Sequence, residues 1–237
     1  MAEVLVLEEV DEVGSTSEVL KARVAAGELG ECALLARRQT GGRGRMGRPW
    51  HSIEGNLLLS ILLRPVSLRH PGHWSILSAV ALAETVRPYL PEPGLLRLKW
   101  PNDALLQGGK LAGILLEAGT SPTPWLVIGF GVNLVRAPDD LERKVACLAD
   151  WSPAPAAPVF ARQLLAALQG WRARYVAEGF APVQAAWLDA AHSPGERVVA
   201  SVGKTRVEGT FRGLGDDGSL LLDGPAGEVA IPAGELA

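Results

Sequence analysis

The sequence predicts an α+β protein, with a mixed, mainly antiparallel sheet that carries helices packed on one face and is followed by a small C-terminal β-barrel. Three observations favour this class. Residues 3–133 alternate short apolar runs with two helical patterns. An Ala-Pro run at 153–158 leads into two further helical segments. After Gly195 the chain contains only short strand-like runs broken by glycine turns, which is typical of a small barrel.

Apolar spacing assigns the elements in order along the chain. In the segment 72–90, for example, Trp74, Leu77 and Val80 recur at helical spacing. The expected strands of the main sheet are 3–9, 32–39, 56–64, 95–100, 103–107, 110–118 and 125–133. The expected helices are 16–27, 72–90, 159–178 and 181–191. The expected strands of the tail are Arg197–Val202, Thr205–Leu214, Ser219–Leu222 and Glu228–Ile231.

The segment from His192 to Gly195, His-Ser-Pro-Gly, is the expected domain boundary. It divides the 237 residues into a main domain, 1–192, and a small domain, 196–237. The main domain holds every motif with chemical content. The small domain supports closure over a ligand or the docking of a partner, or else it simply packs against the main one.

Composition indicates an intracellular enzyme. The formal net charge is −3, and the two cysteines lie far apart on apolar segments, so free thiols are favoured over a disulfide. The first ten residues are acidic and alternating, and no apolar run reaches membrane-spanning length. The four histidines have no metal-ligand spacing. We expect a cytoplasmic protein that does not enter a membrane.

Residues 39–51 form the most informative segment, because they contain four glycines, three arginines and no acid. Such a loop can bring backbone close to an anion. Gly42, Gly44 and Gly47 match the dinucleotide pattern G-x-G-x-x-G, but a second strand rather than a helix follows, which excludes a Rossmann fold. A kinase glycine-rich loop also joins two strands, yet its catalytic motifs are absent. A plain solvated hairpin stays open for this segment taken alone.

A second group of motifs begins at Lys99 with Lys-Trp-Pro-Asn-Asp and continues at Gly108 with Gly-Gly-Lys-Leu-Ala-Gly-Ile-Leu-Leu-Glu. The chain has only five lysines, and two of them flank this single Asn-Asp pair. A plain β-hairpin explains the polar turn residues. It does not explain why Lys110 opens an apolar strand.

With Gly14-Ser15-Thr16-Ser17 and Gly129-Phe-Gly-Val-Asn-Leu134, these motifs resemble the biotin protein ligase family over about residues 10–135. The resemblance implies a fold like the class II aminoacyl-tRNA synthetases with an SH3-like C-terminal barrel. It implies an enzyme that activates biotin with ATP to biotinyl-5'-AMP and then attaches biotin to a lysine of a biotin carboxyl carrier domain. Adenylation brings two anions together, which explains the need for arginine and lysine.

For biotin, the resemblance implies contacts with hydroxyls, an amide and cations. Lys110 would lie between the biotin carboxylate and the phosphate, and Arg45 would contact both halves of the intermediate. Relatives often carry Asn in place of Ser17. The implied biotin-binding residues are Ser15, Thr16, Ser17, Gln39, Arg43, Gly44, Arg45, Lys110 and Gly113.

For ATP, the resemblance implies a stacking face on Trp50 and phosphate contacts from Lys99 and Arg48. Asp103 would bind Mg²⁺ or act as a base, and with Lys110 and Arg45 it completes the implied catalytic set. Two structural alternatives stay open, since Asp103 could form an Asx turn and Asn133 could cap the turn after its strand. The implied ATP-binding residues are Arg45, Arg48, Trp50, Lys99, Asn102, Asp103, Lys110 and Asn133.

Partners follow from the same resemblance. Ser15 comes too early for the DNA-binding domain that makes some relatives repressors, so we expect no DNA binding. The chain ends soon after its last expected strand, so we expect a C-terminal contact to the nucleotide to be missing. Relatives often form homodimers, and we expect one here.

Two alternative functions remain: a lipoate ligase, which shares the fold, and a noncatalytic module that holds RNA or an acidic partner in its arginine loop.

Overall fold

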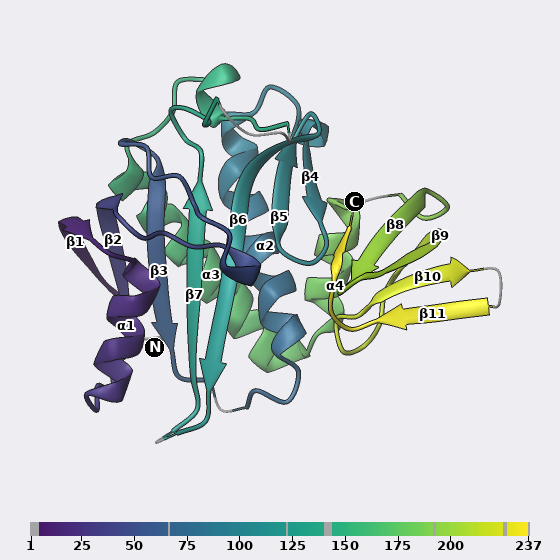
Figure 1. The fold of residues 1–237 in the computed structure, drawn as a ribbon, viewed down its shortest axis with the longest axis horizontal. Coiled ribbons are helices and arrows are strands. Elements are labelled where there is room, and N and C mark those ends of the chain that lie inside the picture. The colour runs from purple at the N-terminus through teal and green to yellow at the C-terminus, as the bar shows by residue number, and fades with distance from the viewer. Residues whose placement is uncertain are drawn as a thin grey trace.

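A seven-stranded mixed sheet forms the body of the protein (Figure 1). The computed structural model describes residues 5–65, 67–121, 123–139, 144–191, 193–224 and 227–236. The strand order is β1-β2-β3-β7-β6-β5-β4, and only β1 and β2 run parallel. The strands are β1 (Val6–Val13), β2 (Cys32–Gln39), β3 (Leu57–Leu63), β4 (Leu96–Lys99), β5 (Asp103–Leu106), β6 (Gly109–Gly119) and β7 (Trp125–Val132). The predicted fold class is confirmed.

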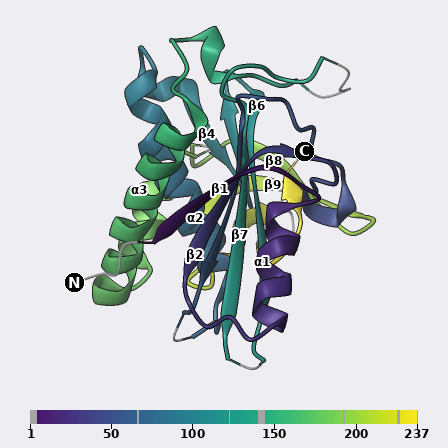
Figure 2. The same ribbon diagram turned by 90° about the vertical axis from the view of Figure 1, so that its left-hand side faces the viewer.

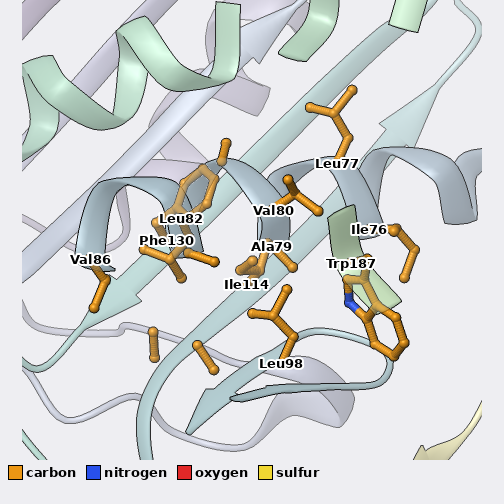
Figure 3. Close-up of a cluster of buried hydrophobic side chains, with 14 of the residues drawn as sticks. Ile76, Leu77, Ala79, Val80, Leu82, Val86, Leu98, Ile114, Phe130 and Trp187 are labelled. Carbon is orange, nitrogen blue, oxygen red and sulfur yellow. The ribbon is translucent and has the colours of Figure 1, made fainter. Parts of the chain in front are cut away.

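Three helices cover one face of this sheet: α2 (Pro71–Val86), α3 (Ala157–Glu178) and α4 (Ala181–Asp189). Figure 3 shows Leu98 and Ile114 of the strands pointing toward Ala79 and Val80 of α2, with Trp187 of α4 beside them. The labelled side chains are all buried, which is the apolar burial that drives folding. Helix α2 ends at Val86, before the predicted residue 90, because Pro88 has no N–H for the next helical bond.

Helix α1 (Thr16–Ala25) lies on the opposite face of the sheet, away from α2 and α3 (Figure 2). Leu20 and Val24 pack there against Leu34, Leu62 and Val127 in a separate apolar cluster. The expectation that all helices share one face is therefore wrong for α1. The central strands are apolar on both faces, so their sequence does not indicate which face each helix covers.

A second, antiparallel sheet forms the C-terminal part. Its strands, in the order β11-β10-β9-β8-β12, are β8 (Arg197–Val202), β9 (Thr205–Leu214), β10 (Leu220–Gly224), β11 (Gly227–Ile231) and β12 (Glu235–Leu236). Within the described residues the hydrogen bonds leave this sheet open, which agrees with the small open barrel that the short strands and glycine turns predict. The two-residue β12, which pairs with β8, is not among the predicted strands.

The two parts share one continuous core. The rings of Trp187 and Phe211 lie 6.4 Å apart, and both residues belong to the same buried cluster as the main sheet. His192, the first residue of the predicted boundary, lies outside the described residues.

Candidate active site

A cavity of about 370 Å³ opens on the sheet face that carries α1, where the loop joining β2 to β3 crosses in front of the sheet (Figure 1). Every predicted site residue except Asn133 lines this cavity. They are Ser15, Thr16, Ser17, Gln39, Arg43, Gly44, Arg45, Arg48, Trp50, Lys99, Asn102, Asp103, Lys110 and Gly113. Residues that lie up to about a hundred positions apart in the sequence are thus brought to one place.

Strand register puts the central residues on a common face. Gly131 of β7 pairs with Gly113 of β6, Gly113 pairs with Asp103 of β5, and Asp103 pairs with Lys99 of β4. Directly paired residues point to the same side of a sheet. The floor of the cavity is therefore a row of paired residues that crosses four strands, with glycine on β7 and β6 and charged side chains on β5 and β4.

Lys110 joins this row because of a β-bulge. The register of β5 and β6 shifts between Ala104 and Leu105, so that Leu105 pairs with Lys110. Without the extra residue, Lys110 and Gly113 would point to opposite faces, since three positions separate them and side chains alternate. The bulge turns the lysine toward the cavity. Its Nζ lies 2.6 Å from Oδ1 of Asp103.

One end of the cavity is built from hydroxyls and an amide. Oε1 of Gln39 accepts hydrogen bonds from the backbone N–H of Thr16 at 2.7 Å and from its hydroxyl at 3.0 Å. Ser60 Oγ shares hydrogen bonds with Thr16 Oγ1 at 2.7 Å and with Ser17 Oγ at 2.9 Å. This end can donate to a carbonyl and accept from N–H groups.

The other end is cationic, with Arg45, Arg48, Lys99 and Lys110 around it. Arg45 donates to Oδ1 of Asn102 at 3.2 Å and to the backbone carbonyl of Gly234 at 3.0 Å. The amide of Asn102 in turn donates to the carbonyl of Ile114 at 2.7 Å. The arginine loop is thereby joined to both β6 and the C-terminal strand.

Glu235 of β12 also lines the cavity. Arg48 binds it through two hydrogen bonds, at 3.0 and 2.8 Å. Burial alone would raise the pKa of this carboxyl, but the bonds and charge of Arg48, with the charges of Arg45 and Lys110, hold its pKa below the usual range. The C-terminal strand therefore lines the cavity, and the expected absence of a C-terminal contact to the nucleotide stays a prediction.

The indole of Trp50 lies against the paired glycines. A Cβ atom at Gly131 would come within 2.3 Å of its Cε2 atom, and one at Gly113 within 3.3 Å of its Cζ3 atom. Gly113 also lies beneath the amine of Lys110. Trp50 thus covers the floor between the hydroxyl end and Lys110, a position that requires glycine at 131 and leaves little room for a side chain at 113.

Asn133 is placed differently from the other predicted residues. It is 3 % exposed, and its amide donates to the carbonyls of Ala146 at 3.1 Å and Lys110 at 3.3 Å. It lines a small neighbouring pocket with Trp50 and Lys110. In this structure Asn133 holds the backbone behind the lysine, which agrees with the turn-capping alternative.

Several residues that line the cavity are not among the predicted ones, and Ser60 and Glu235 are two of them with polar side chains. Ser60 is fully buried in the strand Leu-Leu-Leu-Ser-Ile-Leu-Leu, and a lone hydroxyl in such a strand is a signal that could have found it. Glu235 carries no comparable signal, because a glutamate near a chain end usually lies in solvent.

Comparison with known proteins decides the family. The sequence profile of the biotin/lipoate A/B protein ligase family matches residues 14–133, about half of the chain. The chain belongs to this family. The profile of the biotin protein ligase C terminal domain matches residues 195–236, which correspond to the second sheet. The resemblance inferred from the motifs is confirmed.

Relatives in the family cover almost the whole chain. The biotin–[acetyl-CoA-carboxylase] ligase of Paracoccus denitrificans is 38% identical over 94% of this chain and 95% of its own length. The corresponding ligase of Mycobacterium tuberculosis is 36% identical over 97% and 88%. The biotin protein ligase of Aquifex aeolicus, solved in complex with biotin and ATP, is 27% identical with a TM-score of 0.86 over 98% and 97%.

The residues that the structure describes contain no cluster of three or more His, Cys, Asp or Glu side chains that could hold a metal ion. Among the described helices, none has both the length and the apolar character needed to cross a membrane.

Proposed function

We propose that the protein is an ATP-dependent biotin protein ligase. It activates biotin to biotinyl-5'-AMP, releases pyrophosphate, and transfers the biotinyl group to the ε-amine of a specific lysine on a biotin carboxyl carrier domain of a biotin-dependent carboxylase. The names of the relatives support this activity. The single observation that carries it is one cavity that joins a hydroxyl and amide end to a cationic end.

The two ends suit the two ends of biotin. Thr16, Ser17 and Gln39 offer the donors and acceptors that the carbonyl and N–H groups of a ureido ring require. Lys110 lies at the opposite end, where the carboxylate of a bound biotin would meet ATP. The apolar face of Trp50 lies between them over the glycine floor.

In the first half-reaction, a carboxylate oxygen of biotin attacks the α-phosphorus of ATP. A bond forms between that oxygen and phosphorus, the bond to the β-phosphate oxygen breaks, and pyrophosphate leaves. Lys110 and Arg45 offset the charge of the two anions, while Lys99 and Arg48 bind phosphate oxygens. Such positioning and charge stabilisation are most of what a protein contributes to phosphoryl chemistry.

In the second half-reaction, the neutral lysine amine of the carrier attacks the acyl carbon. An amide bond forms, AMP leaves with the electron pair of the broken C–O bond, and the amine loses one proton. We assign that proton to the carboxylate of Asp103, and its position 2.6 Å from the amine of Lys110 supports this role.

Asp103 also suits Mg²⁺, which prefers carboxylate and phosphate oxygens and keeps several waters. Asp103 and Glu235 are hard oxygen donors, but both already pair with cations. We therefore propose that Mg²⁺ arrives with the nucleotide, held by phosphates and by Asp103, rather than in a preformed protein site.

We also propose that residues 1–192 act as the catalytic domain and residues 196–237 as a small domain that helps to close over ATP. The contacts of Arg45 with Gly234 and of Arg48 with Glu235 support this role. We further propose that the protein is cytoplasmic, that it forms a homodimer and that it binds no DNA. Sedimentation with and without biotin tests the dimer.

The test of the activity is direct. The protein is incubated with biotin, ATP, Mg²⁺ and an unmodified biotin carboxyl carrier domain, and both biotinyl-5'-AMP and the carrier are followed by mass spectrometry. We expect both products, and none of either when lipoate replaces biotin. Modification by lipoate alone would establish the lipoate ligase instead, and no product with either acid would favour the noncatalytic module.

A further inference from the structure

The turn between β9 and β10, residues 215–219, packs directly behind the ATP end of the cavity. The indole N–H of Trp100 donates to the backbone carbonyl of Gly218 at 3.1 Å, and the bond is buried. Trp100 is 2 % exposed and stands between Lys99 and Pro101 in the chain. A residue of the Lys-Trp-Pro-Asn-Asp motif is thus held by the small domain.

The same turn also contacts the first turn of α2. Gly72 and Gly218 meet backbone to backbone, and a Cβ atom at Gly72 would lie 2.9 Å from the carbonyl oxygen of Asp217. Nε2 of His73 donates to the carbonyl of Asp216 at 2.7 Å. Gly218 has φ of +82°, and Oδ1 of Asp217 accepts from the N–H of Ser219 at 2.9 Å, so the turn has a defined shape.

The contacts continue from α2 to the ligand-binding residues. The hydroxyl of Ser75 donates to the carbonyl of Pro101 at 2.7 Å, and the next residue, Asn102, is bonded to Ile114 through both its backbone and its amide. Arg45 then donates to Asn102. Hydrogen bonds, linked by the backbone of α2 and of residues 101–102, therefore connect the turn to the arginine loop.

We propose that the β9–β10 turn is a positioning element for the nucleotide half of the site, acting through the indole N–H of Trp100 and through the first turn of α2. Trp100 is then a positioning residue for Lys99, Asn102 and Asp103. The hydroxyl end of the cavity lies on α1, β2 and β3, which these contacts do not touch, and of the expected biotin contacts only Arg45 is joined to them. The turn therefore acts mainly on nucleotide binding. The inference rests on the proposed function for the identity of the two ligands.

We call the contact of the β9–β10 turn with Trp100 and with Gly72 the seam. Two variants disturb the seam from its two sides. Trp100→Phe keeps an aromatic ring but removes the N–H, which leaves the buried carbonyl of Gly218 without its partner. Gly72→Ala keeps Trp100 but pushes against Asp217. Asp217→Ala, at an exposed position, removes the bond that shapes the turn and serves if either of the other two fails to fold.

The chain offers matched controls. Trp187 is as buried as Trp100, but its indole N–H has no hydrogen-bond partner among the described residues, so Trp187→Phe makes the same change of ring without breaking a described hydrogen bond. Gly170 lies within α3 with nothing within 4 Å of an added Cβ, so Gly170→Ala changes only the helix surface.

Binding of a non-hydrolysable ATP analogue and of biotin is measured separately by calorimetry, with the melting temperature of each variant. We expect the seam variants to weaken analogue binding by about fivefold to thirtyfold, as for one buried hydrogen bond, with biotin binding unchanged within about twofold. The controls should leave both affinities unchanged. Unchanged analogue binding in folded seam variants, or an equal loss for both ligands, would overturn the proposal.

This measurement does not depend on catalysis. A wild-type protein that binds the analogue but makes no biotinyl-5'-AMP would refute the proposed function while leaving the seam fully testable. A wild-type protein that makes the adenylate, with seam variants that bind the analogue normally, would refute the seam alone.

Discussion

The side-chain amine of Lys110 lies 2.6 Å from Oδ1 of Asp103, on the strand face that forms the floor of the cavity. Both side chains are mostly buried, with exposed fractions of 14% and 21%. The lysine owes this position to the β-bulge that turns it toward Asp103. The pair places a cation where two substrate anions would meet and a carboxylate beside it.

Lys110→Ala should slow formation of biotinyl-5'-AMP severely. The lysine would contact two anions, and each charge-assisted bond contributes about 1.5–3 kcal/mol, or roughly one to two orders of magnitude in rate. Single-turnover kinetics with saturating biotin and ATP measures this effect. Lys204→Ala, on the exposed turn after β8, is the control, and an adenylation rate equal to wild type in Lys110→Ala would remove the assigned role.

Arg45→Gly should still make the adenylate but lose it to solvent. Arg45 joins the loop to Asn102 and Gly234, so its removal opens the cation end on two sides. Escaped anhydride would acylate lysines of unrelated proteins, since outside the site nothing restricts the amine. Labelling of a bystander protein is measured beside Arg38→Gly, whose side chain pairs with Glu12. Bystander labelling no higher than in wild type would contradict the retention role.

Glu235→Gln should raise the KM for ATP by a few-fold and leave the KM for biotin unchanged. The variant removes the charge from a bidentate pair with Arg48, and partly exposed pairs contribute about 0–1 kcal/mol. Glu228→Gln breaks the comparable pair with Arg212 on the same small sheet and is the control. An equal rise in the KM for ATP in the two variants would show that the KM depends only on the stability of the small sheet.

Gly131→Ala should displace the indole of Trp50, because the new methyl group would lie 2.3 Å from the ring. Overpacking of this kind costs about 1–3 kcal/mol, so biotin affinity should fall by about tenfold. The fluorescence of Trp50 in the Gly131→Ala variant is isolated by subtracting the spectrum of the double variant, Gly131→Ala with Trp50→Phe. The isolated spectrum should report the changed environment of Trp50. Unaltered biotin binding would show that Trp50 does not cover the biotin path.

Stability should fall as the pH drops below about 6.5 in a way that depends on His73. Burial lowers the pKa of this imidazole, against the opposing effect of the Asp216 carbonyl and of the Asp216 and Asp217 carboxylates; His70 and Tyr175 are its other polar neighbours. Below the ordinary pKa of about 6.5, the unfolded chain therefore binds more protons at this residue than the folded protein does. The contribution of His73 to the free energy of unfolding is full above that pH and is lost as the pH falls below it. The fall in melting temperature between pH 7 and pH 5.5 should be smaller in His73→Gln than in wild type or in His51→Gln. An identical fall in all three would exclude His73 as the cause.

Most of the elements and about half of the residues that line the candidate cavity were predictable from the sequence, because apolar spacing and glycine motifs are local signals. Strands Cys32–Gln39, Arg197–Val202 and Thr205–Leu214 begin and end where predicted. The motifs around Lys99 and Lys110 meet in one cavity because strand pairing joins them.

Features that depend on tertiary contacts were not predictable. The face chosen by α1 is set by its packing on Leu34 and Leu62, and both faces of those strands are apolar. Strand β12 is two residues long and exists because it pairs with β8, so Glu235 carried no sign of its place in the cavity. The role of Asn133 depends on the carbonyls it meets, which lie 13 and 23 positions away.

The most direct test of the account is isotope exchange between labelled pyrophosphate and ATP. If one cavity joins biotin to the α-phosphate, the exchange must require biotin, because only formation of biotinyl-5'-AMP makes the release of pyrophosphate reversible. We expect biotin-dependent exchange in the wild-type protein and little in Lys110→Ala. Exchange that is equally fast without biotin, or unaffected by the loss of Lys110, would contradict the central claim.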